Sequence, residues 1–90
     1  MTPEEYAREI ANKLRKAHNT QNVGDVSAIF EGADKALKDG GISPGSQERF
    51  WANVRAHLAG DVLLVEKQAN SSLLALMRAI EQQLAAREKK

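Results

Sequence analysis

Histidine is the first residue type to consider for catalysis or metal binding, and the chain contains two, His18 and His57. They do not form a His-x-x-x-His pair, and the chain has no cysteine to complete a ligand set. A metal site would require both histidines and several carboxylates to converge from different helices. Both histidines fall near the carboxyl ends of expected helices, where the helix dipole favours a cationic imidazole without any function. The sequence therefore predicts no metal site and no catalytic residue.

Carboxylates, serines and glycines also fail to form a catalytic or cofactor-binding pattern. Acidic residues gather early in the expected helices and basic residues late, which is the order that helix dipoles favour by themselves. The serine segments at Gly45 and at Asn70 do not match a Gly-x-Ser-x-Gly turn, and no histidine is tied to either segment. The glycines of segment 40–45 lack both the dinucleotide fingerprint spacing and the lysine of a phosphate loop. We therefore expect no enzyme activity and no cofactor.

Composition restricts the class of protein further. Ninety residues suffice for one domain with a single small core, and a net charge of +1 gives no reason to expect an anionic partner. The first residues are acidic, whereas a signal peptide begins with basic residues and continues with an apolar run. The longest run of large apolar residues, 62–65, is far shorter than the roughly 20 residues of a membrane span. These features predict a cytoplasmic protein that does not enter a membrane.

Start and stop signals divide the chain into four expected helices over residues 3–18, 23–39, 44–59 and 61–87, with a frayed tail at 87–90. Thr2, followed by Pro3 and Glu5, matches a helix start with a capping box. Asn22 or Asp25 is expected to cap the second helix and Ser43 or Ser46 the third. Gly40 and Gly41 are expected to supply left-handed conformations after the second helix.

The last expected helix has the strongest periodicity in the chain. Its apolar residues recur at a mean interval of about 3.7, the period of a straight helix in a globular bundle. The residues on this face are Val62, Val65, Ala69, Leu73, Leu76, Ile80 and Leu84. We therefore predict an all-α fold, a small four-helix bundle organised around a long C-terminal helix.

Two other divisions of this region stay open. The third and fourth helices would be one rod if Gly60 is a kink rather than a turn. The polar triplet at 70–72 would break the last helix into two if its turn preference dominates. The periodicity of large side chains continues in phase across the triplet, so the sequence favours an intact last helix and a turn at Gly60.

Leucines outside the main apolar face indicate how the protein acts. On a helical wheel, Leu63 and Leu74 lie about a quarter turn from that face, and Leu64 lies nearly half a turn away. A surface helix rarely exposes three leucines in so short a segment, so either this helix is covered on more than one side within the monomer or its first half contacts another protein or a second copy. Of these we favour a non-enzymatic, regulatory protein-protein interaction module, an adaptor, a chaperone-like subunit or a small inhibitor, which presents an apolar helical face with these leucines to another protein or to a second copy. Trp51 and Phe50 are additional anchors if they are not part of the core.

Nucleic-acid binding is the alternative prediction. The segment 32–58 has the order of a helix-turn-helix, and Arg49, Asn53 and Arg55 would be the residues that contact a groove or the phosphate backbone. The turn contains two glycines and a proline, which makes it longer than the usual tight connection. The second helix also has few basic residues, so this prediction ranks below protein binding.

Overall fold

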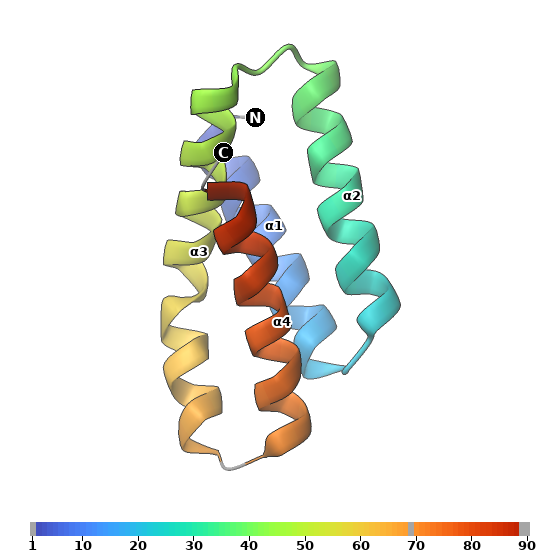
Figure 1. The fold of residues 1–90 in the computed structure, drawn as a ribbon, viewed down its shortest axis with the longest axis vertical. Coiled ribbons are helices and arrows are strands. Elements are labelled where there is room, and N and C mark those ends of the chain that lie inside the picture. The colour runs from blue at the N-terminus through green and yellow to red at the C-terminus, as the bar shows by residue number, and fades with distance from the viewer. Residues whose placement is uncertain (1, 69, 89–90) are drawn as a thin grey trace.

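The computed structural model describes residues 2–68 and 70–88. Within these residues it contains four α-helices and no strand, which confirms the predicted all-α bundle. The helices are α1 (Pro3–Asn19), α2 (Val23–Asp39), α3 (Pro44–Lys67) and α4 (Ser71–Glu88). Successive helices run in opposite directions along the long axis of the molecule (Figure 1). No helix in the described part of the chain is both long and apolar enough to cross a membrane.

The first three helices begin at residues that the sequence marks as caps. The backbone N–H of Glu5 donates to the Thr2 hydroxyl at 3.1 Å, and the Glu5 carboxylate accepts from the Thr2 N–H at 3.3 Å, which forms the predicted capping box. Asn22 caps α2 and Ser43 caps α3. Of the two glycines after α2, only Gly41 is left-handed, with a φ of +69°. The other glycine keeps a right-handed conformation.

The predicted turn at Gly60 and the predicted long helix over 61–87 are both wrong. Helix α3 continues through Gly60 to Lys67 and is the longest helix, with 24 residues, whereas α4 has 18. The helix break instead lies just before Ser71, where α4 begins, and the Asn70 side chain accepts a hydrogen bond from the Leu73 N–H at 3.2 Å. A glycine inside a helix costs about 1 kcal/mol, and an asparagine N-cap stabilises a helix start by a similar amount. The cap at Asn70 therefore offsets the cost of keeping Gly60 inside α3.

This reversal turns the predicted apolar face into the inner surface of a hairpin. Val65 on α3 and Ile80 and Leu84 on α4 are buried, and Val62, Leu73 and Leu76 are half-buried. Ala69, the remaining member of the predicted face, lies outside the described residues. The two halves stay in phase because each presents its apolar side to the other helix of the hairpin, as Val62 does beside Ile80. The frayed tail was predicted from residue 87, but α4 includes Arg87 and Glu88; the last two residues lie outside the described part.

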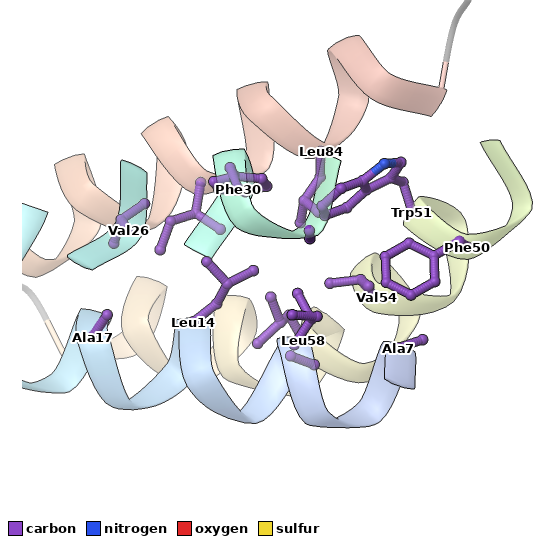
Figure 2. Packing of buried hydrophobic residues seen from close by; sticks show 14 of the residues in the cluster. Ala7, Leu14, Ala17, Val26, Phe30, Phe50, Trp51, Val54, Leu58 and Leu84 are labelled. Carbon is purple, nitrogen blue, oxygen red and sulfur yellow. The ribbon is translucent and has the colours of Figure 1, made fainter. Parts of the chain in front are cut away.

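The core is centred on the aromatic residues of α3. Trp51 packs edge-on against Phe50 at a centroid distance of 5.0 Å and lies 5.5 Å from the ring of Phe30 on α2. Figure 2 shows both α3 rings among buried side chains of the other helices, including Leu84. The guanidinium of Arg87 lies over Phe30 at 4.6 Å and over Trp51 at 5.3 Å. These contacts join α2, α3 and α4 in one cluster.

Candidate functional site

The end of the α3–α4 hairpin projects beyond the rest of the bundle. Helix α3 has 24 residues and is about 36 Å long, whereas the neighbouring α1 has 17 and is about 25 Å long. In Figure 1 the last turn of α3 and the first turn of α4 extend past the connection between α1 and α2. Apolar side chains near this end therefore lack a third helix to cover them.

Two contacts fix where α1 ends against the hairpin. The Arg15 guanidinium donates two hydrogen bonds from Nε at 3.0 Å and one from Nη2 at 2.8 Å to the carboxylate of Asp61 on α3. These hydrogen bonds raise the pKa of Arg15 above its ordinary value. One turn further along α1, Nε2 of the buried His18 donates to the Leu73 carbonyl of α4 at 2.8 Å. In Figure 1 the α3–α4 hairpin continues past the end of α1.

Leu63 and Leu64 lie at this sparsely covered part of the hairpin, and each is 60% exposed. Because they are adjacent in a helix, their side chains point about 100° apart. Leu63 borders a groove between α3 and α4 that also contains Met77 and Ile80. Leu64 follows Asp61 by one turn and therefore lies on the flank next to α1. The two leucines thus occupy opposite flanks of α3.

Leu74, the third predicted contact residue, is half-buried. It lies two turns before Glu81, which lines the same groove as Leu63. The structure therefore places Leu63 and Leu74 on one flank of the hairpin and Leu64 on the other.

The two predicted aromatic anchors belong to the core. Phe50 is 3% exposed and Trp51 is 1% exposed, and both pack against rings from neighbouring helices. The sequence predicted them as partner-binding anchors only if they lay outside the core. Both lie inside it, so neither side chain is available to a partner.

The residues of the nucleic-acid alternative do not share one surface. Arg49 and Asn53 lie one turn apart on α3, and Asn53 borders a shallow hollow with Arg8 of α1. Arg55 points to the opposite flank, where it forms a 2.7 Å ion pair with Glu88 of α4. Figure 1 shows α2 and α3 both roughly aligned with the long axis. The two helices of a helix-turn-helix instead cross at about 90–120°. Nucleic-acid binding remains a prediction that no contact in the structure favours.

The remaining chemistry-bearing residues do not converge among the described residues. His57 is exposed on α3, while His18 is buried and bonded to the α4 backbone. No group of three histidine, aspartate or glutamate side chains in this part of the chain is placed to hold a metal ion.

The sequence interpretation missed a continuous uncharged surface along α3, which we call the outer face of α3. Its residues are all exposed: Ala52, Ala56, Ala59, Gly60 and Leu63. A Cβ placed on Gly60 would meet no atom within 4 Å, so nothing in the described structure lies against this face there. The spacing of three and four residues is visible in the sequence, but a turn at Gly60 would have divided the face between two helices.

The two charged residues within this stretch of α3 are both paired with other helices. Arg55 pairs with α4 through Glu88, and Asp61 pairs with α1 through Arg15. The outer face is therefore uncharged over several turns, and the charged residues nearest to it are paired with neighbouring helices. Comparisons with protein-family models, with curated proteins and with solved structures find no match to this chain.

Proposed function

We propose that the protein is a non-enzymatic interaction module, an adaptor or small regulator that binds another polypeptide through the exposed leucines of its hairpin. The observation that supports this most directly is the 60% exposure of both Leu63 and Leu64 in a helix whose opposite side is core. Leu63 lies on the uncharged outer face of α3, and exposed apolar surfaces of this kind commonly mark protein-protein interfaces. A cytoplasmic location is part of the proposal.

The expected energy is consistent with a moderate interaction. Full burial of a leucine side chain stabilises by about 1.5–3 kcal/mol, so burying the exposed part of each should contribute about 1–2 kcal/mol. That amount corresponds to roughly a tenfold gain in affinity for each leucine. Exposed ion pairs typically contribute less than about 1 kcal/mol, so the leucines should dominate.

The test compares the partners captured by three forms of the protein in cells of its source. The double variant Leu63→Lys with Leu64→Lys should lose a specific cross-linked partner that the wild type retains. Val23→Lys is the matched control, because Val23 is 63% exposed and lies on a different helix. Quantitative mass spectrometry of the cross-linked species provides the measurement. If the double variant captures the same proteins as the wild type in the same amounts, the proposal fails.

A further inference from the structure

The outer face of α3 is unusual for a helix at the edge of a bundle. Helix α1 exposes charged residues such as Arg8 and Lys16, as a surface helix normally does. Helix α3 instead buries Val54 and Leu58 on its inner side and exposes Ala56 and Leu63 on its outer side. A helix that is apolar on both sides is normally central in its assembly. Within the described residues, the single chain therefore provides no helix that covers the outer face of α3.

We propose that a second copy of this chain covers the outer face, with the two α3 helices parallel and related by a two-fold axis along their length. This inference rests on the proposed function and names the partner. The residues of the face favour a helix as the covering element. Ala52, Ala56 and Gly60 recur every four residues, and such small side chains allow two helix axes to approach to about 8 Å.

Charges at the two ends of the face select the second copy and its orientation. Glu48 and Arg49 precede the face, and Glu66 and Lys67 follow it. Each acid-base pair is adjacent in sequence, so its two side chains point about 100° apart and lie on opposite sides of the midline of the face. The pairs are five helical turns apart, so both acids lie on one side and both bases on the other. Within residues 2–68 and 70–88, none of the four forms an intramolecular ion pair.

The symmetry of a dimer decides which charges meet. In a parallel two-fold pair, the acidic side of one helix lies against the basic side of the other, so Glu66 faces Lys67 of the second copy. In an antiparallel two-fold pair, the acidic sides meet each other and so do the basic sides. Like charges in contact are unfavourable, and opposite charges favour one orientation over the other. The charge pattern is therefore complementary to a parallel copy of itself.

The size of the contact predicts a weak dimer. The shared stretch is about 27 Å long and a helix is about 10 Å wide, so pairing would bury roughly 500–600 Å² in total. Stable interfaces bury at least about 1,200 Å². We therefore expect weak, reversible association, which sedimentation at a series of increasing protein concentrations should detect.

The decisive experiment uses the absence of cysteine from the natural chain. In the parallel arrangement Ala52 lies next to Ala52 of the second copy, so the Ala52→Cys variant should form a disulfide dimer on mild oxidation. In an antiparallel arrangement the two Ala52 positions would be far apart, because they lie away from the centre of the face. Ala28→Cys is the control, because Ala28 is also exposed but lies on α2. Ala52→Cys should give several-fold more dimer, and adding Leu63→Lys should remove the excess.

Charge exchange provides an independent test of orientation. Glu66→Lys alone and Lys67→Glu alone should each weaken association, and the double exchange should restore it, because it reverses both members of each facing pair. In an antiparallel dimer the double exchange would instead tighten association by placing opposite charges next to Glu48 and Arg49. Such tightening, or disulfide formation only between Ala52→Cys and Leu63→Cys, would overturn the parallel arrangement.

Failure of this inference is distinguishable from failure of the proposed function. If the wild type stays monomeric at the highest concentration and Ala52→Cys behaves like Ala28→Cys, no second copy covers the face. The proposed function would still stand if the leucine-dependent partner is captured. Loss of both results would overturn both proposals.

Discussion

Arg87 should be the polar residue whose replacement destabilises the bundle most. Its side chain is only 16% exposed, and its guanidinium donates hydrogen bonds to the Asp34 carboxylate at 2.7 and 3.1 Å. The same group lies over the rings of Phe30 and Trp51. Replacing Arg87 with alanine removes a link between α4, α2 and α3, whereas replacing it with lysine keeps the charge but removes the planar fork.

The magnitude follows from three contributions of Arg87. The ion pair should contribute about 0.5–1 kcal/mol, since Asp34 is 39% exposed. Contact of the guanidinium with two rings should add about 0.5–2 kcal/mol, and the packed aliphatic stem a further part. We therefore expect Arg87→Ala to lower the free energy of unfolding by about 2–3 kcal/mol, Arg87→Lys by about half of that, and Asp34→Ala by about 1 kcal/mol.

Thermal and urea unfolding followed by circular dichroism at the helix band measures these values without using Trp51 as the reporter. For a domain of this size, a loss of 2 kcal/mol lowers the melting temperature by about 8–16 °C. Arg8→Ala is the control, because Arg8 is an exposed arginine of α1. A double-mutant cycle with Asp34→Ala isolates the ion pair from the ring contacts. The reasoning is refuted if Arg87→Lys is as stable as the wild type, or if Arg87→Ala costs no more than Arg8→Ala.

Three further predictions test the division of the helices and the alternative function. Gly60→Ala should stabilise the protein by up to about 1 kcal/mol in urea unfolding, because α3 is continuous there and the added Cβ meets no atom; clear destabilisation would restore the turn. Asn70→Ala should cost about 1 kcal/mol through loss of the α4 cap, and Asn70→Asp should retain most of that stability; equal losses in both variants would contradict the capping role. Generic duplex DNA should not bind at low ionic strength, and salt-dependent binding that is lost on Arg49→Ala would reinstate the alternative.

Local sequence determined the class of fold and most helix starts. Thr2, Asn22 and Ser43 each offer a side-chain oxygen to a backbone N–H three residues later, and that interaction needs no other part of the chain. The core role of the aromatic residues in α3 was less certain from sequence, because aromatic residues are common both in cores and in interfaces. Only the packing of Phe30 and Arg87 against Trp51 decided it.

The position of the last turn depended on tertiary structure. Gly60 and Asn70 are both credible helix breaks locally, and apolar periodicity in phase on both sides of a break does not distinguish one helix from two that face the same core. A single helix over 61–87 would extend about 40 Å, well beyond the 17-residue helices beside it. Division into α3 and α4 instead returns Ile80 and Leu84 to the buried cluster, where their burial outweighs the cost of one glycine inside α3. The same choice keeps α3 unbroken and leaves Leu63 and the small residues before it together on one outer face, which no local pattern determines.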